Sequence, residues 1–313
     1  MKSYLPAVTA LGGGHGLSAS LEALRQVTDR LTAVVTVADN GGSSGRLREE
    51  LGGIPPGDLR MALAALCGSD AHGRQWAKVL QSRFSTEGPL DGHAIGNLLI
   101  EGVWAHLDEV SGLALVGQLL NVRGRVLPMS LTPLSIEADV IGLNPDDRDE
   151  ICVISGQHEV ASTSAHVRSI RLLPKDPPAC PEAIEAVEQA DVIVLGPGSW
   201  FTSVLPHLLV PDLAEAIINA RGRRVLTLNI ASEAETEGYS PASHLDVIVD
   251  HAPGLRFDQI IVDKSFAAND PQLEFRARTM GAELVYADIR LPDGSARHDP
   301  LRLAAVYREL FAH

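Results

Sequence analysis

The chain has 313 residues, of which 45% are hydrophobic and 21% charged, and its formal net charge is −14. This composition is typical of a globular protein and unlike that of a disordered chain. Binding to a nucleic-acid backbone needs a surplus of Lys and Arg, so the charge argues against a nucleic-acid partner.

The termini and the cysteines indicate a cytoplasmic protein. The first residues, MKSYLPAVTALGGG, lack a secretory pattern, and no run of about 18 apolar residues predicts a membrane span. The three cysteines, Cys67, Cys152 and Cys180, are far apart and form no C-x-x-C pair. We therefore expect free thiols in a reducing compartment.

Short apolar runs alternate with amphipathic patterns in the N-terminal half. Strands are predicted at 5–11 and 31–38, and the second is apolar enough to be buried on both faces. Helices are predicted at 17–27, from about Ser44, and at 59–66, 73–84, 95–107 and 111–121.

The middle of the chain differs from its two ends. Residues 125–173 contain short β-like runs between turn-rich stretches, which predicts an antiparallel extension. The alternation then resumes, with a helix at 181–190, the strand DVIVLG, a helix at 206–220 and the strand RVLTLNI. Short strands are predicted near 246, 260 and 283, and a final helix at 300–311.

This pattern predicts an α/β fold. We expect a Rossmann-like, doubly wound and mainly parallel sheet, an αβα sandwich with a small β-rich extension. No Pro-, Gly- or Ser-rich linker divides the chain, so residues 1–313 are predicted to form a single nucleotide-binding domain.

The first glycine-rich loop, GGGHG, lies between a predicted strand and a predicted helix. A helix N-terminus offers unpaired N–H groups, and glycines let an anion approach the backbone. Gly14, Gly16 and Ala19 also fit a permissive dinucleotide fingerprint, with Asp39 where a ribose-binding carboxylate would lie. The alternative is a tight turn with no ligand.

A second loop, ADNGGSSGR, follows the second predicted strand. Two glycines, two hydroxyls and Arg46 at a helix start predict another anion-binding site. Asp39 is a candidate ribose ligand, Mg²⁺ ligand or base, and therefore the candidate catalytic residue. Its alternative role is an Asx-turn or a helix cap.

Two further stretches carry polar residues at predicted helix starts. In IPPGDLR, Asp58 is expected to be the helix N-cap, and Arg60 suggests an anion nearby because a cation there opposes the helix dipole. In GHAIGN, His93 and Asn97 are four residues apart and should share a helix face. A structural role for His93 is an equal alternative.

A fifth loop, GPGSWFTS, follows the strand DVIVL and is expected to precede a helix. Like the first loop, it lies between a predicted strand and a predicted helix, in the other half of the sheet. Two such loops should flank the point where the strand order reverses, which is where ligands of open α/β sheets bind. The loop lacks the second glycine of a nucleophile elbow.

Together these loops resemble the YvcK/CofD-like family, which contains bacterial gluconeogenesis factors and the 2-phospho-L-lactate transferases of deazaflavin coenzyme synthesis. The matching stretches run from about residue 10 to 305, and the sequences of these motifs are most similar to those of the actinobacterial gluconeogenesis factors. They are GGGHGLS, TVADNGGSSGRLREELGGIPPGDLRMALAAL, GHAIGNLL, NVRGRVLPMS, VLGPGSWFTSVLPHLLVP and RHDPLRLA.

The resemblance implies a cytoplasmic, Rossmann-like protein that binds a nucleotide sugar, UDP-N-acetylglucosamine in the gluconeogenesis-factor branch. That branch is linked to carbon metabolism, peptidoglycan precursor supply and cell shape, without an established reaction. The transferase branch moves a phospholactyl group from a nucleotide-activated donor to a deazaflavin, with Mg²⁺.

Carried over by position, the resemblance places the first glycine loop on the ligand's phosphates, Asp39 at the family's acidic position, and Asn229 and Arg297 in the site. Three positions depart from the family pattern. His15 replaces a frequent Thr, Asn40 a frequent Asp, and His207 a frequent Asn. The loss of a carboxylate at Asn40 weakens any Mg²⁺ site there.

We expect a non-catalytic binder of UDP-N-acetylglucosamine, and the alternatives are a transferase of the CofD type and an NAD(P)-binding protein. Mg²⁺ and NAD are its conceivable cofactors. A homo-oligomer, expected to be a dimer, and a protein partner of unknown identity complete the expectations. The ligand-binding candidates are Gly12, Gly13, Gly14, His15, Gly16, Asp39, Asn40, Gly41, Gly42, Ser43, Ser44, Arg46, His93, Asn97, Gly196, Gly198, Ser199, Thr202, Asn229 and Arg297.

Overall fold

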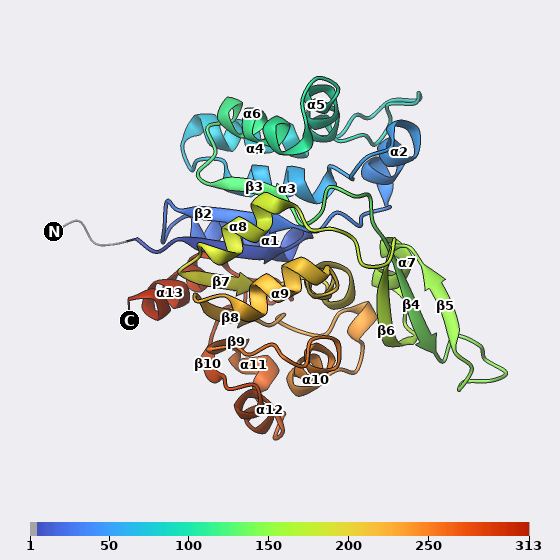
Figure 1. Ribbon diagram of the computed structural model, residues 1–313, viewed down its shortest axis with the longest axis vertical. Coiled ribbons are helices and arrows are strands. Elements are labelled where there is room, and N and C mark those ends of the chain that lie inside the picture. Colours follow the sequence, from blue (N-terminus) through green and yellow to red (C-terminus); the bar gives the residue numbers. More distant parts are fainter. Residues whose placement is uncertain (1–4, 313) are drawn as a thin grey trace.

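The computed structural model describes residues 5–312, and a seven-stranded sheet forms its centre (Figure 1). The strand order is β10-β9-β8-β7-β1-β2-β3, and every neighbouring pair is parallel. The strands are β1 (Val8–Gly12), β2 (Leu31–Val35), β3 (Arg125–Pro128), β7 (Val192–Leu195), β8 (Arg223–Thr227), β9 (Gln259–Asp263) and β10 (Glu283–Ala287).

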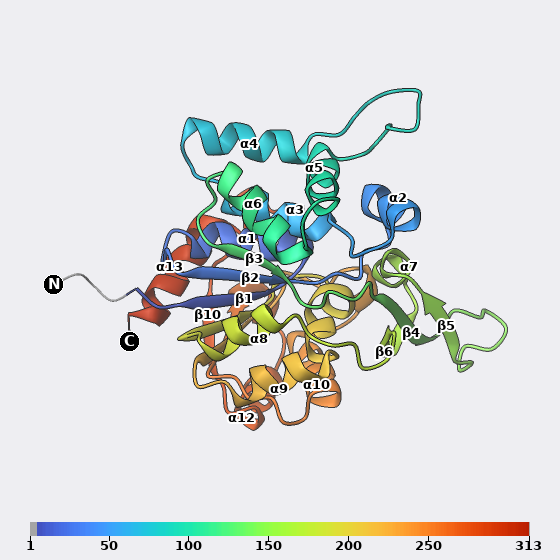
Figure 2. The same ribbon diagram turned by 45° about the horizontal axis from the view of Figure 1, so that its top comes forward.

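Helices cover both faces of this sheet (Figures 1 and 2), which confirms the predicted α/β sandwich. One face carries α1 (Gly14–Leu24), α3 (Gly57–Leu66) and α13 (Pro300–Phe311), and the other carries α8 (Pro181–Glu188) and α9 (Pro211–Asn219). Outside α3 lie α4 (Ala71–Gln81), α5 (Ile95–Trp104) and α6 (Glu109–Leu119), while α2 (Gly42–Leu51) follows β2.

The strand order reverses between β1 and β7. From β1 the chain moves outward to β2 and β3, returns to the other side of β1 as β7, and then moves outward through β8, β9 and β10. Every residue of β1 and β7 is buried, as expected of central parallel strands. The carboxyl ends of these two strands therefore mark the topological switch point.

The predicted β-rich extension is a three-stranded antiparallel sheet in the order β5-β4-β6. It contains β4 (Ser135–Ile141), β5 (Cys152–Ser155), β6 (His166–Leu173) and the short helix α7 (Gln157–Ser162). The expected boundary at residue 125 was wrong, because residues 125–128 form β3, which pairs with β2 in the main sheet.

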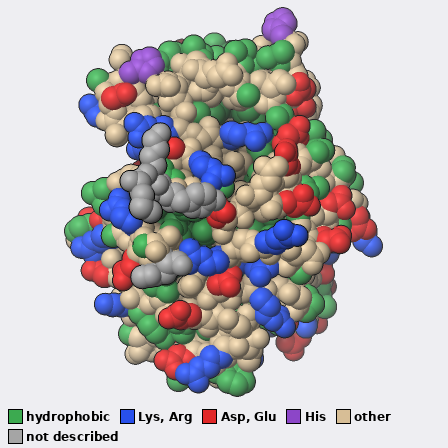
Figure 3. All heavy atoms as spheres, turned by 60° about the vertical axis from the view of Figure 1, so that its left-hand side comes forward, with side chains coloured by type: hydrophobic (Ala, Val, Ile, Leu, Met, Phe, Trp, Pro, Cys, Tyr) green, Lys and Arg blue, Asp and Glu red, His purple; other side chains and the backbone are tan. Residues whose placement is uncertain are grey.

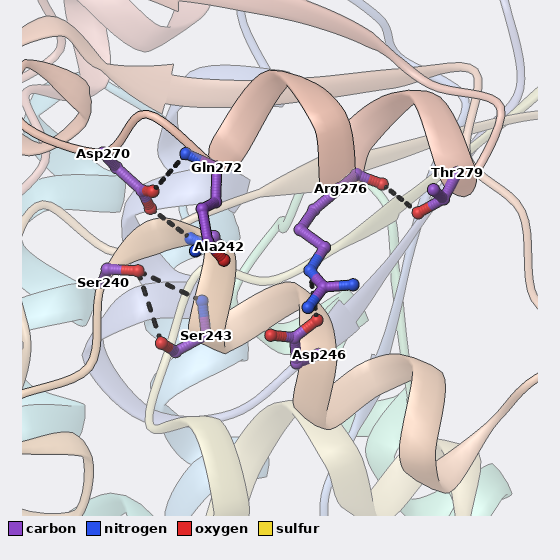
Figure 4. Close-up of polar contacts among 8 residues, drawn as sticks. All are labelled: Ser240, Ala242, Ser243, Asp246, Asp270, Gln272, Arg276 and Thr279. Atoms are coloured by element: carbon purple, nitrogen blue, oxygen red, sulfur yellow. Dashed lines mark hydrogen bonds and ion pairs between the residues drawn. The ribbon is translucent and has the colours of Figure 1, made fainter.

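The strand predicted near residue 246 was also wrong, because that segment lies in helix α10 (Pro241–His251). Ser240 caps the helix by accepting a hydrogen bond from the Ser243 N–H at 3.3 Å, and Pro241 occupies the first turn. Figure 4 shows α10 beside α12 (Leu273–Thr279), with which it is paired through Asp246 and Arg276. The apolar run DVIVD is too short to distinguish a strand from a helix by its period.

The helix predicted at 206–220 is interrupted. Residues 205–208 form a 3₁₀ turn that follows a π-helical turn at 200–204, and α9 begins only at Pro211. Among residues 5–312 no single helix has the length and apolarity of a membrane span, although the bent pair 200–208 and 211–219 reaches them when the two are taken together.

Charged side chains of both signs occur on the face shown in Figure 3, interspersed with hydrophobic and uncharged ones. The net charge of −14 is therefore not gathered into one acidic patch on this face.

Helix α13 ends on the side of the molecule away from the antiparallel extension (Figure 1).

Candidate functional site

A cleft of about 920 Å³ lies at the carboxyl ends of β1 and β7. Ligand pockets commonly measure roughly 300–1,000 Å³, so the cleft has room for a nucleotide-sized molecule. Nine predicted site residues line it: Gly13, Gly14, His15, Gly16, Gly198, Ser199, Thr202, Asn229 and Arg297. They come from both halves of the sheet and meet at the switch point, as the two glycine loops predict.

The first glycine loop leaves its backbone open toward the cleft. Gly14 begins α1 with φ +57°, and nothing lies within 4 Å of the position that a Cβ would take. Gly16 has the opposite surroundings, because a Cβ there would lie 2.5 Å from the Cα of Gly198. The two glycine loops thus touch at Gly16 and Gly198, and only residues without a side chain permit this approach.

Asn229 fixes the second of these loops. Its Oδ1 accepts a hydrogen bond from the Gly198 N–H, and its Nδ2 donates to the Gly198 carbonyl, each at 2.9 Å. The side chain pairs with Gly198 as a strand partner would, and 4% of it is exposed. Asn229 therefore positions the loop on the cleft wall from the end of β8.

A buried glutamate binds the backbone at the end of the same loop. The carboxylate Oε1 of Glu235 accepts a hydrogen bond from the Phe201 N–H at 3.0 Å, at the start of the π-helical turn 200–204. Burial raises the pKa of Glu235 to about 8. Glu233, on the cleft wall, accepts a hydrogen bond from the Ser199 hydroxyl at 3.2 Å.

Asp58 also lines the cleft, and the sequence analysis did not count it as a site residue. Its expected role as an N-cap is wrong, because Pro56 holds that position and Asp58 lies within the first turn of α3. Its Oδ2 is buried without a hydrogen-bond partner and would lie 2.5 Å from a Cβ on Gly13. Burial, and then the charge of Asp39, raise the pKa of this carboxyl to about 7, while the Gly14 N–H opposes the shift.

Among the described residues that line the cleft, Arg297 supplies the Lys or Arg side chain. Arg297 is exposed, and its positive charge, like that of Arg25, lowers the pKa of Glu22 against the raising effect of burial. His298 follows Arg297, and its Nε2 lies 3.1 Å from the Leu228 carbonyl. Burial lowers the pKa of His298 to about 4, so this ring is neutral at physiological pH.

The second loop does not line the cleft. The Asp39 Oδ1 accepts a hydrogen bond from the Gly41 N–H at 2.8 Å, which is the Asx-turn weighed as its alternative role. Asn40 donates to Glu159 at 3.1 Å and accepts from the His158 N–H at 3.0 Å, so it joins the loop to α7. An aspartate at position 40 would face Glu159 with a like charge.

The remaining polar candidates form a buried cluster between α2 and α5. The Ser43 hydroxyl lies 3.1 Å from the His93 Nδ1 and accepts hydrogen bonds from the Ala94 N–H and from the Asn97 Nδ2. His93 precedes α5, so the expected helix face shared with Asn97 is wrong. The cluster joins helices and does not line the cleft.

Two arginines are likewise engaged by the protein. Arg60 donates from Nε to the Asn97 Oδ1 at 2.8 Å and also donates to Gln81, so the anion that it suggested is replaced by neutral acceptors. Arg46 donates to the Asp91 carbonyl at 2.6 Å. His207, the third departure from the family pattern, is buried with its Nε2 3.1 Å from the Val34 carbonyl.

The other predicted glycines, and the Ser44 hydroxyl, do not line the cleft. They are Gly12, Gly41, Gly42, Ser44 and Gly196. Several lining residues were missed because they lie outside the motifs that the sequence offered. They are in α7, in the turn before residue 234 and in the segment 291–296, and include Gln157, Ala161, Glu233 and Leu291.

The described residues do not form a metal site by themselves. Residues 5–312 contain no group of three or more His, Cys, Asp or Glu side chains that could hold a metal ion. Asp39 uses one oxygen for the Asx-turn, and Asn40 is bound to α7. The Mg²⁺ site that the sequence left possible at Asp39 therefore does not fit these residues.

Comparisons with known proteins agree with this architecture. The family model described as "2-phospho-L-lactate transferase CofD" matches residues 8–299. The chain is 52% identical over 304 residues to a Mycobacterium tuberculosis protein named "Putative gluconeogenesis factor", covering 96% of this chain and 88% of the relative. It is 34% identical to the "Gluconeogenesis factor" of Listeria innocua, covering 95% of this chain and 93% of the relative.

A solved structure is similar over almost the whole chain. It is a member of the UPF0052 family from Bacillus halodurans, with a TM-score of 0.82 and 35% sequence identity. The alignment covers 96% of this chain and 98% of that one.

Proposed function

This chain belongs to the CofD/UPF0052 family, whose members similar to it are named as gluconeogenesis factors, and we propose that it is a cytoplasmic regulatory protein that binds UDP-N-acetylglucosamine. In this proposal the bound nucleotide sugar reports on peptidoglycan precursor supply and links it to carbon metabolism and cell shape. The protein acts by changing its interaction with a partner and not by turnover of its ligand.

One observation carries the proposal: two glycine loops touch at the switch point of the sheet and open into one cleft. Backbone N–H groups at the start of α1 can receive a diphosphate without a cluster of lysines. Parts of a ligand on either side of the diphosphate would reach α7 and the segment 291–298, which line the same cleft. A nucleoside diphosphate linked to a sugar has this three-part shape.

The alternatives make different demands on the site. An NAD(P)-binding protein needs Asp39 as a ribose acceptor, but Asp39 lies outside the cleft wall and is engaged by the Gly41 N–H. A CofD-type transferase would use Mg²⁺, a nucleotide-activated donor and a deazaflavin acceptor. The thermal shift of the protein distinguishes these ligands.

We expect UDP-N-acetylglucosamine to raise the melting temperature without added Mg²⁺. A ligand at a hundredfold excess over its Kd stabilises the folded state by about 2.7 kcal/mol. For a chain of this size each kcal/mol corresponds to roughly 2–4 °C. UMP and N-acetylglucosamine, each lacking half of the ligand, should shift the transition far less.

Scanning fluorimetry with a nucleotide panel, followed by calorimetry, makes the measurement. A response to GDP that requires Mg²⁺, together with deazaflavin binding, would favour the transferase. A response to NAD alone would contradict the proposal. The expected dimer stays a prediction, which light scattering of the purified protein can test with and without nucleotide.

A further inference from the structure

Asp58 is a partly buried residue of the cleft wall, and one oxygen of its carboxyl is buried without a partner. It lies in the first turn of α3 but caps no helix, and it takes part in none of the ion pairs found in residues 5–312. Its Oδ2 has no hydrogen-bond partner there and is closed to solvent. A buried carboxylate oxygen without a partner is costly, so such a group usually serves a ligand or holds a proton.

The surroundings of this oxygen face the first glycine loop. A Cβ built on Gly13 would lie 2.5 Å from the Asp58 Oδ2, 2.5 Å from the Thr36 Cγ2 and 3.2 Å from the Ser203 Oγ. An unsatisfied carboxyl oxygen thus lies beside the backbone that the proposed function assigns to the ligand's phosphates.

The charges that reach Asp58 disfavour its ionised form. Asp39 adds a negative charge from the end of β2, while Arg60 on α3 and the Gly14 N–H of α1 act in the opposite direction. Arg60 donates its own hydrogen bonds to Asn97 and Gln81, which leaves none assigned to Asp58. A diphosphate on the glycine loop would bring further negative charge to the same place.

We propose that Asp58 is a ligand-binding residue that acts in its neutral form, with its carboxyl O–H donating a hydrogen bond to a phosphate oxygen, so that the binding of the nucleotide takes up one proton from solvent. This inference rests on the proposed function and adds the group that recognises the phosphate. An ionised carboxylate would repel the phosphate, whereas the neutral carboxyl offers the phosphate an O–H donor.

The proposal predicts a specific pH dependence. The pKa of Asp58 in the free protein is raised to about 7, and the bound phosphate raises it further. Between the two pKa values the complex holds one more proton than the free protein, and affinity falls by up to about tenfold per pH unit. Below the lower pKa both states are protonated, and affinity is independent of pH.

Calorimetry with UDP-N-acetylglucosamine at about pH 6 to about pH 8.5, in two non-phosphate buffers of different ionisation enthalpy, measures the proton uptake directly. The diphosphate of this ligand is a diester and takes up no proton in that range. We expect uptake near zero at the acid end, rising toward one proton above about pH 7.5. Wild-type binding without proton uptake at any pH overturns the inference.

Variants assign the proton. Asp58→Asn keeps a donor of similar shape without a titrating proton, so it should bind with no proton uptake and with affinity independent of pH. Glu101→Gln is the matched control, because the pKa of Glu101 is also raised to about 7 but this residue lies on α5, outside the cleft wall. It should keep the wild-type uptake and affinity.

The outcomes separate this inference from the proposed function. Uptake that persists in Asp58→Asn shows that another group takes the proton and overturns the role of Asp58. A wild-type protein that binds UDP-N-acetylglucosamine without proton uptake contradicts the inference alone and leaves the proposed function standing. A wild-type protein that does not bind UDP-N-acetylglucosamine at any pH contradicts the proposed function and, with it, this inference.

Discussion

Gly14 begins α1 in the left-handed region of backbone space, with φ +57° and open space where a side chain would project. Gly14→Ala would place a methyl group over the loop. It should lower the free energy of unfolding by about 1–2 kcal/mol, because alanine is disfavoured at a positive φ. We expect the variant to fold, with a lower melting temperature, and to lose at least about tenfold in nucleotide affinity, equivalent to about 1.4 kcal/mol.

Gly102 provides the control for this substitution. It lies in α5, also with nothing within 4 Å of a Cβ, but its φ is not in the left-handed region. Gly102→Ala should therefore be neutral or stabilising by about 0.5–1 kcal/mol, with unchanged affinity. If calorimetry shows the same affinity for Gly14→Ala as for wild type, the glycine serves only the turn.

At the same scale, the sequence predicted the residues of the cleft better than their partners. The glycine loops could be predicted because a strand, a glycine-rich turn and a helix occur in order along the chain, whereas Asn229 was predicted only from the family resemblance. Asp58 was assigned to a cap because its position before an apolar run suited one. Only the folded chain shows that its Oδ2 lies beside Gly13, since that contact joins α3 to the end of β1.

Helices α10 and α12 are joined by a single carboxylate that serves both. Asp270 accepts hydrogen bonds from the Ala242 N–H at 2.6 Å and from the Gln272 N–H at 3.0 Å (Figure 4). Asp270→Ala removes both acceptors at once, and we expect a loss of about 1–2 kcal/mol in the free energy of unfolding. Denaturant unfolding measures this loss.

The neighbouring ion pair is the comparison for this prediction. Asp246 and Arg276 lie 2.9 Å apart, but 42% and 38% of their side chains are exposed. Exposed pairs contribute about 0–1 kcal/mol, so Asp246→Ala should cost less than Asp270→Ala. Neither residue lines the cleft, and nucleotide affinity should not change in either variant. The reverse order of stabilities would contradict the capping role of Asp270.

The two elements that the sequence assigned wrongly have different causes. The segment 246–250 is short and apolar, so its period could not separate a buried strand from a helix, and the start signal at Ser240 and Pro241 lies several residues earlier. Strand β3 was assigned to the extension because its parallel partner, β2, lies about ninety residues earlier in the chain. Pairing over that distance is decided by the sheet and not by local pattern.

For the molecule as a whole, the reversal of strand order between β1 and β7 followed from the two glycine loops. The contribution of the antiparallel extension to the cleft could not be predicted from these loops. It brings α7 to the cleft wall through contacts such as that of Asn40 with His158, which are 118 residues apart. No local pattern indicates such a contact, so the sequence predicted the position of the cleft but not all of the wall around it.

The pH dependence of the stability of the whole protein follows from its buried titrating groups. The carboxyls Asp58, Glu101 and Glu235 have pKa values raised to about 7, 7 and 8 by burial. Between the ordinary carboxyl pKa and these values the folded state binds more protons than the unfolded state, so stability falls as pH rises. His207 and His298, with pKa values lowered to about 4, act in the opposite direction, but only up to the ordinary histidine pKa.

Well above about pH 6.5 the histidines are neutral in both states, and the carboxyls determine the slope, joined at about pH 8.5 by the thiols of Cys67 and Cys180, whose pKa values burial raises to about 11. We therefore expect the melting temperature of the ligand-free protein to fall between about pH 6.5 and about pH 8.5. Glu235→Gln tests the largest contribution, because glutamine keeps the oxygen that accepts the Phe201 N–H and carries no charge. This variant should melt above wild type at about pH 8.5, and the difference should shrink or reverse near about pH 6, where wild-type Glu235 is neutral. An unchanged difference between the two proteins at both pH values would show that Glu235 does not titrate in this range and would contradict a pKa of about 8.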